Sequence, residues 1–189
     1  MSRIDPVTRS EAPIMLRAID WYSRRKFGQE MLQTGVIAHN PRFLLPLATM
    51  TAFSSGKAEI APEIRALAMH LVAEINGCAW CIDFGARAAL DQGISPAKVA
   101  AVGDYASSPL FDDAERAALA CAEEMTREGG HVRDATFEEL RRHFSDTEIV
   151  ELVVAIAAEN FYNRVNGALG IESQGLCAVP LAASAGARA

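Results

Sequence analysis

Helical spacing of apolar residues is the feature that most constrains the fold of this chain. Over the whole sequence, apolar residues recur every three or four positions rather than in alternation, and this period is typical of helices with one buried face. Alternating segments rich in Val, Ile and Thr that meet at a hairpin turn are not found. The sequence therefore predicts an all-α fold.

Helix starts are marked by prolines and by capping residues. A proline at the first helical position predicts three starts; these are Asn40-Pro41, Ala61-Pro62 and Ser95-Pro96. The spacing of a capping box, in which two residues satisfy free amides of the first turn, predicts three more; these are Asp112 with Glu115, Thr136 with Glu139 and Ser145 with Glu148. Together these signals divide the chain into a series of helices.

The last of these helices has an unusual composition. From Ile149 to Ala158 it is apolar over nearly its whole surface, which predicts a helix that is central or buried against another subunit. Gly167 and Gly170 are expected to end it.

Composition and charge indicate one soluble globular domain. The chain has 189 residues, of which 50% are hydrophobic and 22% are charged, so it needs no disulfide framework or structural metal to hold a core. A net charge of -6 without a block of Lys or Arg excludes the electrostatic footprint of a nucleic-acid or anionic-lipid partner. No apolar run approaches the length of a membrane helix or a secretory signal, which predicts a cytoplasmic protein.

The domain boundaries follow from the same patterns. We expect an N-terminal extension over residues 1–11 and a single helical domain over residues 12–176. A C-terminal tail of mostly small residues covers residues 177–189, and residues 178–189 of it are expected to be weakly ordered.

Two cysteines, Cys78 and Cys81, are the candidate reactive groups. Asn76-Gly77 is a helix stop, because both residues tolerate the left-handed conformation that closes a helix. A new helix near Cys78 would place both thiols on one face of its first turn, close enough to form a disulfide. Free amides and the positive dipole end at that point lower a thiol pKa from about 8.5. The pair therefore has the environment of a nucleophilic thiol.

Two other interpretations of the cysteines are a zinc site and simple packing in the core. Half of a zinc site is disfavoured, because tetrahedral zinc takes four ligands and the sequence has no second closely spaced Cys or His pair. Two buried cysteines that act as small hydrophobes are a stronger alternative. Cys121 and Cys177 are expected to lie outside the site, with Cys121 packed in a helix.

The segment Ile75-Asn-Gly-Cys-Ala-Trp-Cys81 resembles the redox-active motif of the carboxymuconolactone decarboxylase and AhpD-like alkylhydroperoxidase superfamily. Phe144–Leu152 running into Asn160–Asn166 is similar to the terminal core helix of that family, and Val36–Phe43 to its His-Asn/His-Pro segment. The resemblance covers roughly residues 30–172. It implies an AhpD-like helical bundle that assembles as a homo-oligomer and that uses no haem, flavin or metal cofactor.

The same resemblance implies peroxidase chemistry. Cys81 would attack a hydroperoxide as a thiolate and become a sulfenic acid, and Cys78 would condense with it to a disulfide. A dithiol reductant protein, of the lipoyl or thioredoxin-like kind, would then reset the pair.

The chain departs from the family pattern where protons are transferred. Gly85 stands where the alkylhydroperoxidases carry a histidine, and Ala66 stands where they carry a glutamate. His70 and Glu74 follow Ala66 on one helical face that leads toward the cysteines, so either is a candidate base. Asp83 is a third candidate. For each of them an ordinary structural role, as a core or solvated residue, is the competing interpretation.

Two further features bear on the pocket. Glu159 and Arg164 lie on the apolar helix and could line a pocket, although an internal or intersubunit ion pair between them is favoured. Trp80 and Phe84 could form an apolar wall that favours organic hydroperoxides over hydrogen peroxide.

Three functions are compatible with these observations. The leading prediction is a thiol-dependent peroxidase, or a slower thiol-disulfide oxidoreductase built on the same pair. The second is a lyase of the decarboxylase branch that acts on a lactone carboxylate, which does not need the cysteine pair. The third is a non-catalytic, redox-sensing or scaffold homologue, which the Gly85 and Ala66 departures make credible.

Overall fold

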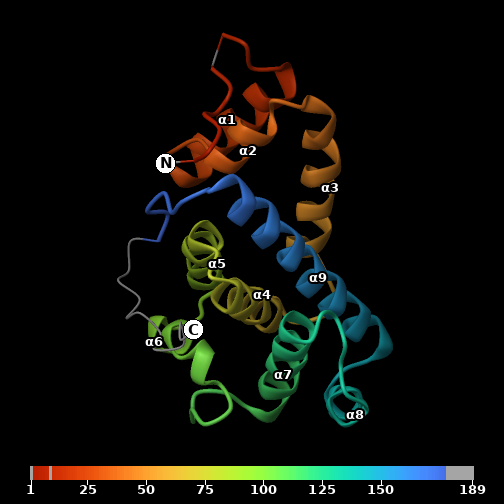
Figure 1. The fold of residues 1–189 in the computed structure, drawn as a ribbon. Coiled ribbons are helices and arrows are strands. Elements are labelled where there is room, and N and C mark those ends of the chain that lie inside the picture. Colours follow the sequence, from red (N-terminus) through yellow and green to blue (C-terminus); the bar gives the residue numbers. More distant parts are fainter. Residues whose placement is uncertain (1, 9, 178–189) are drawn as a thin grey trace.

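The computed structural model describes residues 2–8 and 10–177. Over this part of the chain it contains helices and no strand, so the predicted all-α fold is confirmed (Figure 1). The α-helices of the described residues are α1 (Ile14–Phe27), α2 (Leu32–Ile37), α3 (Leu44–Ser55), α4 (Pro62–Asn76), α5 (Ala79–Asp91), α6 (Pro96–Ala100), α7 (Asp113–Arg127), α8 (Asp134–His143) and α9 (Asp146–Leu169). Two short 3-10 helices cover Pro41–Phe43 and Val102–Asp104.

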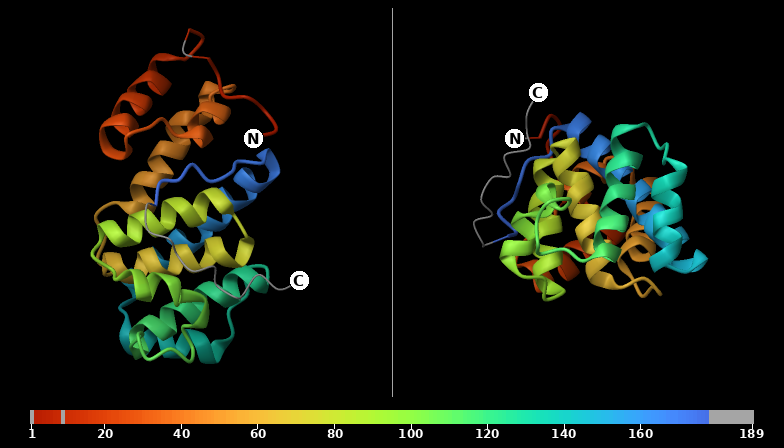
Figure 2. Two further views of the ribbon diagram at one scale, coloured as in Figure 1. Left: turned by 90° about the vertical axis from the view of Figure 1, so that its left-hand side faces the viewer. Right: turned by 90° about the horizontal axis from the view of Figure 1, so that it is seen from below.

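Helix α4 is the centre of the bundle. It packs against α5, α7 and α9, while α1, α2 and α3 gather at one end of the molecule and α7 and α8 at the other (Figures 1 and 2). The main core consists of apolar side chains from these central helices, and burying each such side chain stabilises the fold by about 1.5–3 kcal/mol. Its fully buried members include Leu67, Val72, Leu119, Leu152 and Ile156.

Most of the predicted helix starts are confirmed. Asn40 caps a 3-10 helix, Pro62 begins α4, Ser95 caps α6, and complete capping boxes start α7 at Asp112 and α9 at Ser145. The predicted start at Thr136 is wrong, because α8 already begins at Asp134. Thr136 donates its hydroxyl hydrogen to Glu124 Oε1 at 2.7 Å instead, so it joins α8 to α7 and does not cap α8.

Helix α9 has the central position predicted for it, in contact with α3, α4 and α7. It ends at Leu169, and Gly170 closes it with a φ of 64°. Gly167 lies inside the helix, so the expectation that both glycines end it is half wrong; only Gly170 needs the left-handed conformation. One side of α9 is open, since Val150 is 62% exposed and Val154 50% exposed.

Residues 171–177 run from the end of α9 back along α5 (Figure 1). The Asp83 carboxylate of α5 holds this segment by four hydrogen bonds of 2.7 to 3.0 Å. The donors are Ser173 Oγ and the backbone amides of Gln174, Leu176 and Cys177. Cys177, the first residue of the predicted tail, is therefore anchored, while residues 178–189 lie outside the described residues.

Of the helices that the structure describes, none combines the length and the apolar composition needed to cross a membrane.

Candidate functional site

The two cysteines lie at the junction of α4 and α5, as predicted. Gly77 closes α4 with a φ of 65°, and Cys78 directly caps the N-terminus of α5, where its Sγ accepts the Cys81 amide hydrogen at 3.4 Å. The two thiols form a disulfide with a Cα–Cα distance of 5.2 Å. Both residues are buried, so the disulfide sits inside the protein at the positive end of a helix.

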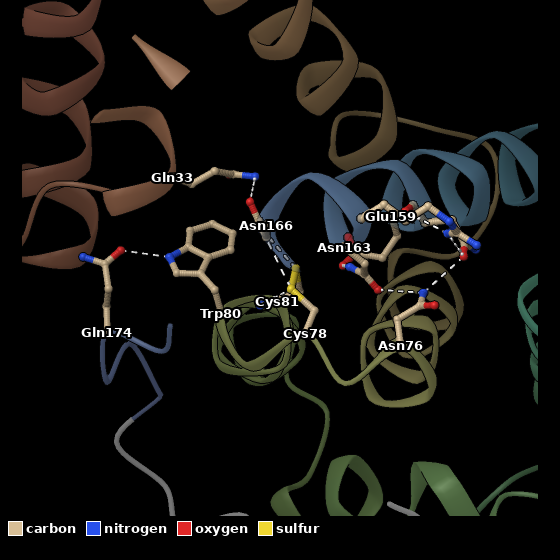
Figure 3. The surroundings of a disulfide bond; sticks show 11 residues. Gln33, Asn76, Cys78, Trp80, Cys81, Glu159, Asn163, Asn166 and Gln174 are labelled. Carbon is tan, nitrogen blue, oxygen red and sulfur yellow. Dashed lines mark hydrogen bonds between the residues drawn. A yellow bond between two sulfur atoms is a disulfide. The ribbon is translucent and has the colours of Figure 1, made fainter. Parts of the chain in front are cut away.

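The Asn166 side chain of α9 contacts both sulfur atoms (Figure 3). This fully buried amide donates its Nδ2 hydrogens to Cys81 Sγ at 3.2 Å and to Cys78 Sγ at 3.9 Å. Its own oxygen accepts from Gln33 Nε2 at 2.8 Å, which fixes the amide with its hydrogens toward the sulfurs. Sequence reasoning missed Asn166. The available signal was the spacing of Asn160, Asn163 and Asn166, which puts three amides on one helix face.

We expect Asn166→Leu to raise the pKa of the Cys81 thiol in a Cys78→Ser background by about one unit. A hydrogen bond to a charged group contributes about 1.5–3 kcal/mol, and one pKa unit corresponds to about 1.4 kcal/mol. The measurement is thiolate absorbance at 240 nm as a function of pH. Asn160→Leu is the matched control, because the Asn160 amide donates to Thr126 and Ile156 and not to sulfur. An unchanged pKa in Asn166→Leu would show that the amide does not stabilise the thiolate.

A cavity of about 130 Å³ lies beside Cys81. One wall is formed by Trp80 and Phe84, whose rings are stacked with centroids 5.1 Å apart. Polar side chains that reach the cavity include Gln33, Arg65 and Glu159. The arrangement therefore places Cys81 next to a small cavity that both apolar and polar residues line.

Glu159 is the buried carboxyl group of this cavity. It is 9% exposed and accepts a hydrogen bond from Asn163 Nδ2 at 2.6 Å. Burial raises the pKa of Glu159 to about 7, against the opposing effect of the Asn163 hydrogen bond. The internal form of the ion pair favoured from the sequence is wrong, because Arg164 donates to the Asn160 backbone and side-chain oxygens instead. The intersubunit form stays a prediction. The alternative, that Glu159 lines the pocket, is what the structure contains.

His70 and Glu74 are close to each other, and neither is among the residues that line the cavity. His70 is fully buried, and its Nε2 lies 3.5 Å from Glu74 Oε1. Its Nδ1 would lie only 3.1 Å from a Cβ atom at Gly85. The His70 ring therefore lies against Gly85, whereas Ala66 and Gly85 themselves line the cavity.

Asp83, the third candidate base, has another task. Burial raises its pKa, but the four hydrogen bonds from residues 173–177 outweigh burial and hold the pKa below its ordinary value. A carboxylate whose oxygens are engaged in this way is a poor proton acceptor. Asp83 therefore holds the C-terminal segment in place, which is the ordinary structural role that competed with its role as a base.

The remaining chemistry-bearing groups do not add to this site. Cys121 is buried in α7, as predicted, and burial raises the pKa of its thiol to about 11, which makes it unreactive. Among the described residues, His, Cys, Asp and Glu side chains form no group of three or more that could hold a metal ion.

Fold and site together define an all-helical protein with a closely spaced, buried cysteine pair beside a cavity. Residues 44–124 match the model of the carboxymuconolactone decarboxylase family. The chain is 31% identical to YnjA of Escherichia coli (strain K12) over 173 residues. This aligned region covers 90% of this chain and 94% of YnjA. The chain therefore belongs to the carboxymuconolactone decarboxylase family, as its cysteine segment predicted.

Solved structures show the same fold. An AhpD-core, peroxidase-related protein from Ralstonia eutropha JMP134 superposes with a TM-score of 0.83 at 19% identity, over 92% of each chain. The debrominase Bmp8, solved in complex with 2,3,4-tribromopyrrole, superposes with a TM-score of 0.78 at 24% identity, over 93% of this chain and 94% of Bmp8. The predicted AhpD-like helical fold is confirmed by these similarities.

Proposed function

We propose that this protein is a thiol-dependent peroxidase that reduces hydroperoxides with Cys78 and Cys81. One observation carries the proposal: Cys81 lies in the first turn of α5 and lines a cavity, and its sulfur receives an amide hydrogen from Asn166. A helix N-terminus and an amide donor both favour the thiolate, and a cavity lets a substrate reach it.

In the proposed cycle the Cys81 thiolate attacks one peroxide oxygen and becomes a sulfenic acid. Cys78 then condenses with that sulfenic acid, which releases water and forms the disulfide. The oxidised end of this cycle corresponds to the bonded pair of the structure. A dithiol reductant protein of the lipoyl or thioredoxin-like kind returns two electrons to the pair, which fits a reducing, cytoplasmic compartment.

The cavity supports organic substrates over hydrogen peroxide. The stacked Trp80 and Phe84 rings give it an apolar wall beside Cys81, and such a wall binds the alkyl or aryl part of a hydroperoxide. The same wall favours a second candidate function, thiol-dependent dehalogenation of a small aromatic ring, since a structural neighbour is a debrominase solved with a tribromopyrrole.

The exposed apolar residues support the expected homo-oligomer. Val150, Val154 and Phe161 of α9 and Phe53 of α3 are all at least 45% exposed, and α3 packs against α9. A second copy of the chain would bury such a surface. Sedimentation velocity of the full chain measures this assembly.

The experiment that tests the proposed function is stopped-flow mixing of fully reduced protein with cumene hydroperoxide or hydrogen peroxide. Trp80 fluorescence reports the reaction in a Trp21→Phe background, because the chain has only these two tryptophans and Trp21 is 67% exposed. We expect second-order thiol oxidation that is faster with cumene hydroperoxide.

Thiols that persist for many minutes at millimolar hydroperoxide would contradict the proposed function. Loss of bromide from a bromopyrrole by the same protein would then support the dehalogenase candidate. Silence with both substrates and in a dithiol exchange assay would leave the lyase or the non-catalytic scaffold.

A further inference from the structure

Cleavage of a hydroperoxide releases an alkoxide, and an alkoxide is a poor leaving group unless it receives a proton as the O–O bond breaks. Neither Gly85 nor Ala66 carries an ionisable side chain for this purpose. His70 and Glu74 lie outside the described lining of the cavity, and Asp83 is occupied by the C-terminal segment. The proposed peroxidase therefore lacks an assigned acid.

We propose that Glu159 is the general acid that protonates the leaving oxygen of a hydroperoxide held in the cavity beside Cys81. This inference rests on the proposed function and names a catalytic residue for it. Glu159 comes from α9 and Cys81 from α5, and both residues line the same cavity, which is where the proposal places the hydroperoxide.

The Glu159 carboxyl group is fixed in place by a chain of amides. Asn163 donates to Glu159 Oε1 at 2.6 Å, and Asn76 donates to Asn163 Oδ1 at 3.0 Å (Figure 3). Asn76 is the last residue of α4, two positions before Cys78. The helix junction that positions the cysteines therefore also orients Glu159.

Burial, and not a neighbouring charge, is the main cause of the raised pKa of Glu159. The ionisable groups that share its cavity are Arg65 of α4, Cys81 of α5 and Tyr162 of α9. Arg65 donates to the Gly56 carbonyl at 2.7 Å, and Glu151 is the charge that offsets its burial. Tyr162 donates to the Leu47 carbonyl at 3.1 Å. Burial thus dominates, and the raised pKa of Glu159, about 7, agrees with a proton donor.

The step balances in atoms and electrons. The Cys81 thiolate attacks the terminal oxygen of ROOH, so that an S–O bond forms as the O–O bond breaks. The electron pair of the O–O bond stays on the RO oxygen, which takes the Glu159 proton and leaves as ROH. Sulfur is oxidised by two electrons to the sulfenic acid, the peroxide is reduced, and Glu159 regains its proton from water.

The test compares two oxidants that differ in their need for an acid. The leaving group of cumene hydroperoxide is an alkoxide, which needs a proton. The leaving group of peracetic acid is acetate, which needs none. Glu159→Gln keeps the size of the side chain and an oxygen for Asn163. We expect this substitution to lower the rate of thiol oxidation about 100-fold with cumene hydroperoxide and about threefold or less with peracetic acid. Glu63→Gln, which changes an exposed carboxylate of α4, is the matched control and should match the wild type.

Wild-type protein gives a second readout that needs no variant. The rate with cumene hydroperoxide, divided by the rate with peracetic acid, should fall as pH rises through about 7, because Glu159 loses its proton there. The fall should vanish in Glu159→Gln. An equal loss with both oxidants, an unchanged rate in Glu159→Gln or a flat wild-type ratio would each overturn the role of Glu159. Wild-type thiols that react with neither oxidant would instead overturn the proposed function, and this inference with it.

Discussion

Replacing Cys81 by serine is expected to lower the rate of hydroperoxide-dependent thiol oxidation about 1,000-fold or more. A serine hydroxyl is a weak nucleophile, and removal of a nucleophile typically costs this much or more. The sulfur that would be lost belongs to a residue that lines the cavity, and it lies 3.2 Å from the Asn166 amide nitrogen. Stopped-flow oxidation of the reduced variant by cumene hydroperoxide measures the loss.

Cys78→Ser is the matched control for that experiment. It should keep the first step and stop at the sulfenic acid of Cys81, because the partner that condenses with the sulfenic acid is missing. Dimedone labelling followed by peptide mass analysis locates the sulfenic acid. A label on Cys78 in the Cys81→Ser protein, formed at the wild-type rate, would reverse the roles assigned to the two cysteines.

The second large effect is on stability. Asp83→Ala is expected to lower the free energy of unfolding by about 3 kcal/mol, because four donors of the C-terminal segment lose a charged acceptor. For a chain of this size that corresponds to a fall in Tm of about 6–12 °C. Thermal unfolding followed by circular dichroism measures it. Asp91→Asn, which changes a 41%-exposed carboxylate on the same helix, should shift Tm by little.

The same residue gives the protein a pH dependence. The pKa of Asp83 is lower in the folded protein than in the unfolded chain. Its contribution is therefore fully present above the unfolded value near 4 and is lost as pH falls below it. Wild-type stability should fall below about pH 4 more steeply than that of Asp83→Ala. Parallel curves for the two proteins would show that the Asp83 carboxylate does not hold the segment.

Local sequence signals were sufficient to predict much of the fold. Side-chain caps placed the starts of α6, α7 and α9, because they accept amide hydrogens of their own first turn. Pro62 placed the start of α4, because a proline has no amide hydrogen to leave unpaired there. The helix start at Thr136 was predicted wrongly because the Thr136 hydroxyl donates to Glu124 of another helix. The local spacing of residues does not reveal such a tertiary contact.

The candidate site was predictable only in part, for the same reason. The cysteines and their helix junction are close in sequence, and their pairing was predicted correctly. Asn166 and Gln33 come from two distant helices, and only the fold brings Asn166 to the sulfurs and Gln33 to Asn166. Glu159 was assigned to an ion pair because Arg164 follows it closely in sequence, but the two side chains have different partners.

The measurement that tests the central claim most directly is product analysis of a single turnover. Fully reduced protein is mixed with one equivalent of cumene hydroperoxide, the alcohol is quantified, and the cysteines are mapped by mass spectrometry. We predict one cumyl alcohol for each new Cys78–Cys81 disulfide, with Cys121 left as a thiol. Recovery of intact hydroperoxide together with free Cys78 and Cys81 thiols would contradict the account.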